Sequence, residues 1–213
     1  MRAVALALTL ALCCAASAHE VDVTTPAKAV TPAQAGAQSS LAIAAHPHLN
    51  VIAPTPDFAL RDPSGALVRL SDLRGQIVLV AFIYTSCTTV CPILSQQMAT
   101  LQKRVKADKV LRGRVMLLSV TVDPSRDSAA VLAKYASHLG ADSASWKFLR
   151  DSPEATSPVL AAYHEWTKPM PDGDLDHPAR VHLIDPDGQI REIYSLAFFD
   201  PRQVLVDIRS LAR

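Results

Sequence analysis

Two cysteines separated by three residues carry the clearest chemical signal in this sequence. Cys87 and Cys91 follow an apolar, β-branched and aromatic run at residues 77–84, and Pro92 comes directly after the second cysteine. Such a run predicts a buried strand, and a proline at a first-turn position predicts a helix beginning beside it. Side chains at i and i+4 on a helix turn lie about 5–6 Å apart. These two thiols can therefore share a metal ion or close a disulfide.

A helix N-terminus favours ionised sulfur, because its free N–H groups and the helix dipole stabilise a thiolate. Thiolates are soft ligands that select Cu(I) or Zn, and two of them leave either metal short of ligands. The best third candidate is His177, which follows a Pro-, Asp- and Gly-rich segment at residues 168–175. We expect this segment to be a loop that brings His177 to the cysteines, with Asp176 as a candidate to orient its imidazole. One copper per chain would then be held by two sulfurs and one nitrogen.

Other residues compete for a place in this site. His182 lies inside a predicted strand, where we expect it to face solvent or a neighbouring strand. Met170 is a thioether in the expected loop beside His177, whereas Met98 falls on an apolar helical face and is expected in the core. His19, His46 and His48 are candidate auxiliary copper ligands near the N-terminus.

The N-terminus has the pattern of a secretory signal. Arg2 supplies a positive charge, residues 3–16 are apolar, and Ala-Ser-Ala at residues 16–18 fits a cleavage site. The apolar stretch is shorter than the roughly 20 residues that span a membrane. We expect residues 1–18 to be a signal peptide and the mature chain to be periplasmic, without a membrane span. The alternative is a chain anchored by an uncleaved N-terminal segment.

Signal cleavage changes the cysteine count. Cys13 and Cys14 would leave with the signal, so that Cys87 and Cys91 remain as the only pair. An exported protein with one close pair is not a disulfide-stapled scaffold. The pair is therefore expected to be a redox disulfide or a metal site.

The elements that position the cysteines follow from hydrophobic periodicity and turn residues. Residues 19–50 lack aromatic side chains and read as a flexible, disordered linker, and residues 51–213 read as one globular domain. We expect a hairpin at residues 57–70 and a polar turn at 71–75. Further predicted strands and helices alternate after it: strands at 77–84, 115–122, 146–149, 181–185 and 189–194, and helices at 92–105, 129–136, 153–164 and from 201 onward.

Alternating strands and helices predict an α/β fold with a central mixed sheet flanked by helices. This is the layout of a thioredoxin-like fold with an N-terminal β-hairpin extension. Asp123, Arg126 and Asp127 are expected to cap a helix and shape a turn. The chain has a net charge of +1, with 49% hydrophobic and 19% charged residues. Nothing in this balance favours nucleic acid or an anionic membrane surface as a partner.

Three segments of the sequence resemble the Sco/SenC family. They are Phe-Ile-Tyr-Thr-Ser-Cys-Thr-Thr-Val-Cys-Pro at residues 82–92, Ser-Val-Thr-Val-Asp-Pro-Ser-Arg-Asp at 119–127, and Asp-His-Pro-Ala-Arg-Val-His-Leu-Ile-Asp-Pro-Asp-Gly at 176–188. The resemblance covers roughly residues 54–213. It implies a thioredoxin-like domain that binds one copper through Cys87, Cys91 and His177.

The resemblance also implies a partner. Members of this family supply copper to the binuclear copper site of cytochrome c oxidase, or keep its thiolates reduced. The expected partners are therefore a copper-accepting protein such as a cytochrome c oxidase copper subunit, together with a copper donor or a thioredoxin-like reductant. The family usually has Pro-Asp after the first cysteine, where this chain has Thr88 and Thr89.

Alternative functions use the same cysteines. A thiol:disulfide oxidoreductase would need Cys87 and Cys91 as catalytic residues but would not need His177. A peroxidase would use Cys91 in a Thr-x-x-Cys pattern, but Tyr84 stands where that family has proline. A redox or copper sensor would have no catalytic role. The sequence leaves open whether the chain is an enzyme.

Overall fold

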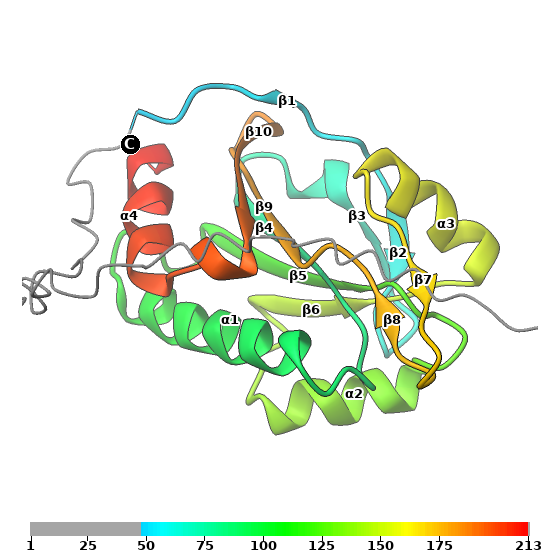
Figure 1. The fold of residues 1–213 in the computed structure, drawn as a ribbon. Helices are drawn as coiled ribbons and strands as arrows, with labels where there is room; N and C mark the ends of the chain where they lie inside the picture. The colour runs from blue at the N-terminus through cyan, green and yellow to red at the C-terminus, as the bar shows by residue number, and fades with distance from the viewer. Residues whose placement is uncertain (1–47, 213) are drawn as a thin grey trace, which may run out of the picture. The chain divides into compact units, whose positions relative to one another are not determined.

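The protein folds into a mixed α/β domain (Figure 1), and the structure, a computed structural model, describes residues 48–212. The expected signal peptide and most of the expected linker, with Cys13, Cys14, His19 and His46, lie outside the described residues. Within these described residues the elements follow one another in this order: β1 (Ala53–Pro54), β2 (Ala59–Arg61), β3 (Leu67–Arg69), the 3-10 helix η2 (Leu70–Leu73), β4 (Ile77–Ile83), α1 (Val90–Ala107), β5 (Val115–Thr121), α2 (Ala129–His138), β6 (Trp146–Leu149), α3 (Pro153–Ala162), β7 (Lys168–Pro169), β8 (Leu175–Asp176), β9 (Arg180–Ile184), β10 (Gln189–Ser195), the 3-10 helix η3 (Leu196–Phe198) and α4 (Pro201–Leu211).

A six-stranded mixed sheet forms the centre of the domain, in the order β1-β10-β9-β4-β5-β6. β4, β5 and β6 are parallel, whereas β9 and β10 run antiparallel to their neighbours. Every residue of β4 and β5 is buried, as expected for continuous apolar strands covered on both faces. The predicted thioredoxin-like fold with a mixed central sheet is confirmed.

Helices cover the sheet and begin where the sequence predicts. In Figure 1, α1 and α2 run below the sheet, α4 lies beside α1, and α3 lies on the other side near β2 and β3. Ser128, Ser152 and Asp200 cap α2, α3 and α4 by accepting backbone N–H bonds. α1 differs, because it begins at Val90 rather than Pro92 and its N-cap residue Thr89 makes no side-chain capping bond.

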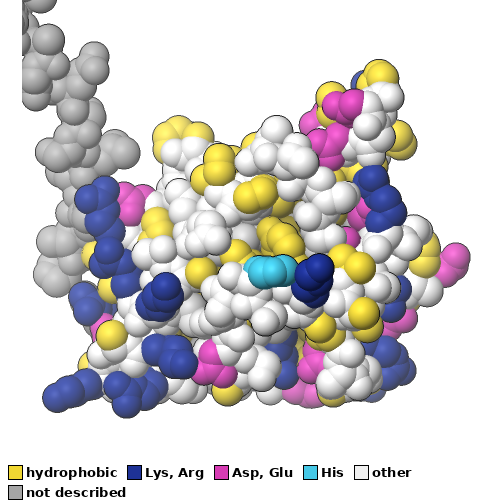
Figure 2. Space-filling view, turned by 90° about the horizontal axis from the view of Figure 1, so that it is seen from below, with side chains coloured by type: hydrophobic (Ala, Val, Ile, Leu, Met, Phe, Trp, Pro, Cys, Tyr) yellow, Lys and Arg dark blue, Asp and Glu magenta, His cyan; other side chains and the backbone are white. Residues whose placement is uncertain are grey.

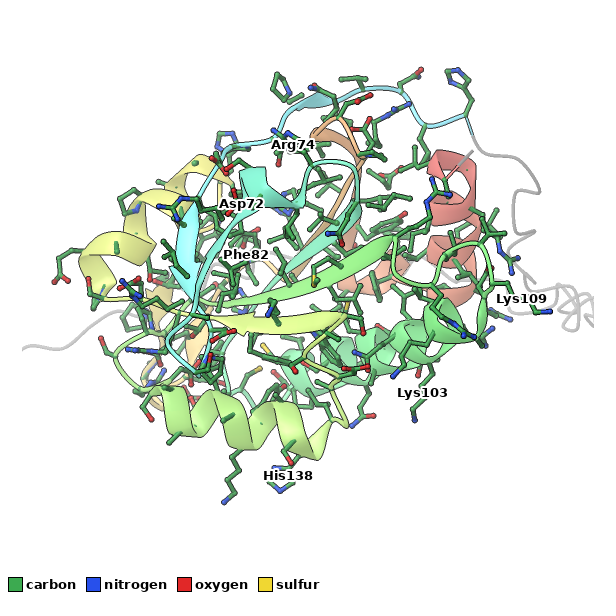
Figure 3. All side chains as sticks on the ribbon, turned by 180° about the vertical axis from the view of Figure 1, so that it is seen from behind. Asp72, Arg74, Phe82, Lys103, Lys109 and His138 are labelled. Carbon is green, nitrogen blue, oxygen red and sulfur yellow. The ribbon has the colours of Figure 1, made fainter. Side chains whose placement is uncertain are left out.

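Aromatic side chains fill the space between the sheet and α3. Phe82 is fully buried and packs against Tyr163, with the two ring centroids 5.3 Å apart. Figure 3 shows Phe82 inside the domain, whereas Lys103, Lys109 and His138 point away from it. This packing fixes the position of β4, and therefore the position from which the loop after β4 begins.

Several short elements complete or change the predicted layout. The expected N-terminal hairpin is present as β2 and β3. β1, which the sequence analysis does not foresee, pairs with β10 at the edge of the sheet. Residues 168–175 are not a simple loop, because β7 and β8 pair there as a second small hairpin. Part of the expected polar turn at residues 71–75 is the 3-10 helix η2.

The face formed by α1 and α2 mixes hydrophobic and polar side chains, and Lys and Arg gather towards one side of it (Figure 2). The C-terminal half of α1 carries exposed Lys103, Arg104 and Lys106. Between residues 48 and 212 we find no helix whose length and apolar character would let it cross a bilayer.

Candidate metal centre

Cys87, Cys91 and His177 meet at one edge of the central sheet. Cys87 lies in the loop after β4, and Cys91 lies in the first turn of α1. His177 follows β8 and precedes β9, which runs antiparallel to β4 with Val181 opposite Ala81. The start of β9 therefore lies beside the end of β4, which brings together residues that are about 90 positions apart in the chain.

The cysteines and the histidine contact one another in pairs. Cys91 Sγ lies 3.7 Å from His177 Nε2. The Cys91 backbone N–H donates to Cys87 Sγ at 3.3 Å, so this sulfur takes the capping position that the Thr89 side chain leaves free. The Thr89 hydroxyl lies 3.7 Å from the same sulfur. Both cysteines are free and buried, which corresponds to the reduced dithiol state.

The two thiols have different acidities. Burial acts to raise the pKa of Cys87, but the backbone N–H groups of Cys91 and Thr89 outweigh it, so that the pKa lies below its ordinary value. Deeper burial raises the pKa of the Cys91 thiol well above its usual range, and the nearby Cys87 adds to this effect. Cys87 is therefore the thiol that ionises first.

His177 is buried against Tyr84. Its ring makes an edge contact with the Tyr84 ring, with centroids 5.4 Å apart. Burial lowers the pKa of His177, against the opposing effects of the Pro178 carbonyl and the Asp176 carboxylate. A neutral imidazole is the form that binds metals. His177 Nδ1 has no hydrogen-bond partner, so the expected orienting bond from Asp176 is absent, because the Asp176 side chain faces solvent.

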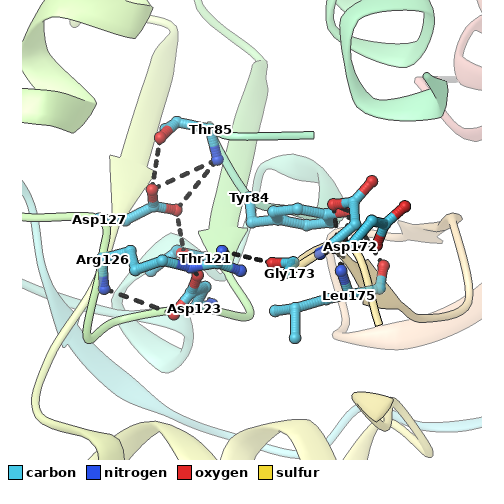
Figure 4. Close-up of polar contacts among 10 residues, drawn as sticks. Tyr84, Thr85, Thr121, Asp123, Arg126, Asp127, Asp172, Gly173 and Leu175 are labelled. Carbon is cyan, nitrogen blue, oxygen red and sulfur yellow. Dashed lines mark hydrogen bonds and ion pairs between the residues drawn. The ribbon is translucent and has the colours of Figure 1, made fainter. Parts of the chain in front are cut away.

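A buried carboxylate anchors the loop that carries Cys87. Asp127 accepts hydrogen bonds from the Thr85 backbone N–H and, at 2.5 Å each, from the hydroxyls of Thr85 and Thr121 (Figure 4). Asp123, Arg126 and Asp127 shape a turn as expected, since the Asp123 carbonyl oxygen accepts the N–H groups of Arg126 and Asp127. The expected helix cap is wrong, because Ser128 caps α2. Asp127 instead joins the end of β4 to the end of β5.

The competing ligand His182 lies in the core. It is 2% exposed, and its ring contacts Phe82 on β4 and Tyr163 after α3. Burial lowers its pKa to about 4. The expectation that His182 faces solvent is therefore wrong, and the expectation that it faces a neighbouring strand is confirmed.

The remaining candidates lie away from the thiols or at the surface. Met98 is buried in the core as expected, and Met170 is 45% exposed at the tip of the β7–β8 hairpin. His48 is exposed near the start of the described residues, and Thr88 is exposed between the cysteines. Within residues 48–212, none of these four residues forms a hydrogen bond with Cys87, Cys91 or His177.

Two residues near the site are not singled out by the sequence analysis. The Tyr84 hydroxyl donates to the Asp174 carboxylate. Burial raises the pKa of Tyr84 itself, with Asp174 adding to the shift. The sequence signal for Tyr84 is weak, because it reads only as the last residue of a buried strand.

The donor set of the site suits a soft metal ion. Two thiols and one neutral imidazole are ligands that copper and zinc accept, and the unpartnered Nδ1 leaves the imidazole free to present Nε2 to the sulfur side. Among residues 48–212, no three His, Cys, Asp or Glu side chains are already gathered at metal-binding separations. Cys91 instead contacts each of the other two residues, Cys87 and His177, in a separate pair.

Comparison with known proteins gives a consistent result. The family model described as SCO1/SenC matches residues 50–213. The "SCO1 protein homolog" of Bacillus subtilis is 30% identical over 142 residues, covering 65% of this chain and 72% of that protein. The chain spans about half the length of the mitochondrial SCO2 relatives it matches.

Two solved structures are similar in fold and sequence. The structure of Bradyrhizobium japonicum ScoI with copper bound has a TM-score of 0.64 and 28% identity, and the match covers 75% of this chain and 99% of that one. The second structure is that of BsSco, a member of the Sco family of cytochrome c oxidase assembly proteins, in which a disulfide switch has been identified. It has a TM-score of 0.67 and 25% identity, and the match covers 78% of this chain and 98% of that one.

Proposed function

Because the chain belongs to the SCO1/SenC family, we propose that it binds one copper ion through Cys87, Cys91 and His177. The observation that carries this proposal is the 3.7 Å contact between Cys91 Sγ and His177 Nε2, across 86 positions of sequence. A relative 28% identical to this chain has been solved with copper bound, which supports copper as the metal. The thiolates and the neutral imidazole suit both Cu(I) and Cu(II).

The copper is cargo in this proposal. The protein delivers it to, or keeps reduced, the copper-site thiolates of a cytochrome c oxidase subunit or a related exported cuproprotein. Support comes from BsSco, a relative described as belonging to the cytochrome c oxidase assembly proteins. A copper donor, or a thioredoxin-like reductant of the cysteine pair, would act before this step.

The residues have distinct tasks in such a cycle. Cys87 offers a thiolate first, because its pKa is lowered. Cys91 and His177 lie deeper and form the touching pair that completes the site. Exposed Thr88, Pro92 and Ile93 flank the cysteines, so a partner reaches the thiols from this side of α1.

A second candidate function is thiol:disulfide exchange. It is favoured by the two free cysteines and by the lowered pKa of Cys87. The Cys87 thiolate would attack a disulfide in a partner, forming a mixed disulfide and releasing one partner thiolate, which takes up a proton. The Cys91 thiol would then lose its proton and attack Cys87 Sγ, releasing the second partner thiol. The partner is reduced by two electrons, and Cys87–Cys91 becomes a disulfide.

Substituting His177 separates these functions. His177→Ala removes one of the three proposed ligands. Loss of a residue that only hydrogen-bonds to a ligand already lowers metal affinity about 10–100-fold. We therefore expect at least about a 100-fold loss of Cu(II) affinity. Disulfide formation between the cysteines should persist. Copper stoichiometry, thiolate-to-Cu(II) absorption and a competition titration measure the binding.

His138→Ala is the matched control, because His138 is an exposed histidine that points outward at the end of α2 (Figure 3). It should bind one copper per chain as the parent does. Unchanged Cu(II) affinity in His177→Ala would refute the ligand assignment. A parent protein that holds no copper but rapidly reduces a protein disulfide would favour the second function.

The proposed site of action is outside the cytoplasm. Residues 1–18 have the charge and apolar pattern of a signal peptide, and we propose that cleavage leaves a mature periplasmic chain starting at His19. The alternative is an uncleaved anchor. N-terminal sequencing of the protein from its native host should give His-Glu-Val; an intact Met1 or Arg2 would support the anchor instead.

A further inference from the structure

His177 directly follows a very small hairpin. β7 and β8 contribute two residues each, and Lys168 pairs with Asp176. The turn between them, from Met170 to Gly173, is exposed. Isolated two-stranded hairpins are marginally stable in water, so these few backbone bonds do not by themselves determine where the hairpin, and with it His177, lies.

Tyr84 ties this hairpin to the end of β4. Its hydroxyl donates to the Asp174 carboxylate, accepts from the Leu175 N–H at 3.3 Å and lies 2.9 Å from the Leu175 carbonyl oxygen. The same side chain supports the His177 ring by its edge contact. Tyr84 is 1% exposed, and it therefore links the rigid core to both the hairpin and the histidine.

Arg126 ties the turn of the hairpin to the end of β5. Its guanidinium donates to the Gly173 carbonyl oxygen at 2.7 Å and pairs with the Asp123 carboxylate (Figure 4). Asp123 comes shortly after β5, which is buried along its whole length. The two ties come from neighbouring parallel strands and reach adjacent residues of the hairpin, Gly173 and Asp174.

We propose that Tyr84 and Arg126 clamp the β7–β8 hairpin onto the ends of β4 and β5, and thereby position His177 beside Cys91 before a metal ion arrives. This inference rests on the proposed function, because it makes the two residues positioning residues for the copper site. Holding a ligand in its bound geometry raises affinity by avoiding the ordering cost at the moment of binding. A hairpin released from the clamp would have to be ordered again each time copper binds.

Tyr84→Phe tests the clamp, because it removes the hydroxyl and keeps the ring that supports His177. In the copper-free protein, the Met170 and Gly173 amides, which bond to Asp174 and Met170 within the hairpin, should exchange at least about tenfold faster. Cu(II) affinity should fall at least about tenfold, since hydrogen bonds to charged groups have this weight. Hydrogen exchange by NMR and a competition titration give the two readouts.

Tyr194→Phe is the matched control. It also removes a tyrosine–carboxylate bond, from the Tyr194 hydroxyl to Asp207 at 2.6 Å, but at the contact between β10 and α4. It should leave hairpin exchange and Cu(II) affinity unchanged. A comparison of thermal unfolding between the two variants corrects for any general loss of stability.

A double-mutant cycle tests whether the bond itself matters. Asp174→Ala should weaken Cu(II) binding as Tyr84→Phe does, and the double variant should be no weaker than either single one, because both remove the same bond. Asp174→Asn keeps an acceptor oxygen and should restore most of the affinity. Additive losses of affinity in the double variant would overturn the proposal.

Two further outcomes would also overturn it. One is unchanged exchange of the hairpin amides in Tyr84→Phe. The other is a loosened hairpin with Cu(II) affinity equal to that of the parent. The exchange measurement needs no copper, so a parent protein that binds no copper refutes the proposed function, while a loosened hairpin in the variant would still support the clamp.

Discussion

At the scale of single residues, the two cysteines are chemically unequal although the sequence presents them as a pair. Cys87 accepts a backbone N–H from the first turn of α1, whereas Cys91 is buried against His177. The pKa of Cys87 is lowered and that of Cys91 is raised for these reasons. In either proposed function, Cys87 is the residue that reacts first with a partner.

A buried carboxyl group outside the site has an unusual environment. The Glu165 side chain is fully buried and both of its oxygens lack hydrogen-bond partners. Burial raises its pKa to about 7, and Arg180 opposes this only weakly. Arg180 lies 4.0 Å from Glu165 and its side chain is partly exposed, so solvent weakens its attraction for the buried carboxyl group.

Glu165 should make stability depend on pH. In the unfolded chain the carboxyl loses its proton near its ordinary pKa of 4.5, whereas the folded protein keeps it until about 7. Between these values the folded state binds more protons, so the free energy of unfolding falls as pH rises. The full effect is about 3 kcal/mol. Glu165→Gln should remove this fall, as measured by urea unfolding from pH 4.5 to 8.

His182 has the opposite effect on the pH dependence of stability, and the prediction must take it into account. Its folded pKa is about 4 against an ordinary 6.5, so the unfolded state binds more protons in that window and stability rises with pH. The two groups partly offset each other in the parent. The Gln variant should therefore show a rise up to pH 6.5 without the later fall, and identical profiles for the parent and the variant would contradict the assignment.

At the scale of elements, the loop between β4 and α1 depends on a residue from the next loop along the chain. Asp127 is 1% exposed and accepts from Thr85 and Thr121. The polar groups of the Cys87 loop thus find their partner beyond β5. This explains how a loop whose N-cap residue, Thr89, makes no side-chain capping bond keeps its cysteine in place.

Asp127→Ala should be strongly destabilising. It leaves the buried Thr121 hydroxyl and the half-buried N–H and hydroxyl of Thr85 without their acceptor, which costs roughly 2–4 kcal/mol of unfolding free energy. Thermal or urea unfolding measures the loss, and faster alkylation of Cys87 would report the freed loop. Asp151→Ala, which removes a partly exposed ion pair of 3.8 Å with Arg61, should cost less than about 1 kcal/mol. Equal losses in both variants would rule out the anchoring role.

At the scale of the whole molecule, charge and chemistry occupy different ends of α1. The net charge of +1 conceals a group of exposed cations, Lys103, Arg104 and Lys106, in the C-terminal half of the helix. Cys91 lies in its first turn, and at 1.5 Å per residue the two regions are roughly 20 Å apart. The end of α1 that carries Cys91 therefore lies away from the Lys and Arg side chains of this helix.

Most elements follow from local patterns. Apolar runs become β4 and β5, proline and serine signals begin α3, and Asp-Pro begins α4. These features depend on neighbours within a few residues, which the sequence displays directly. The predicted loop at residues 168–175 is a hairpin instead, because two paired residues on each side leave no periodic pattern to read.

The sequence by itself determined the chemistry of the site and the fold that carries it, since a cysteine pair between a buried strand and a helix is a local pattern. The tertiary structure alone decided which side chains meet. His182 sits in the core because β9 is buried on both faces, so alternation of polar and apolar residues gives no orientation. The contacts of His177 with Cys91 and of Tyr84 with Asp174 depend on β9 pairing antiparallel with β4, and strand order is a property of long-range packing that no short stretch of sequence records.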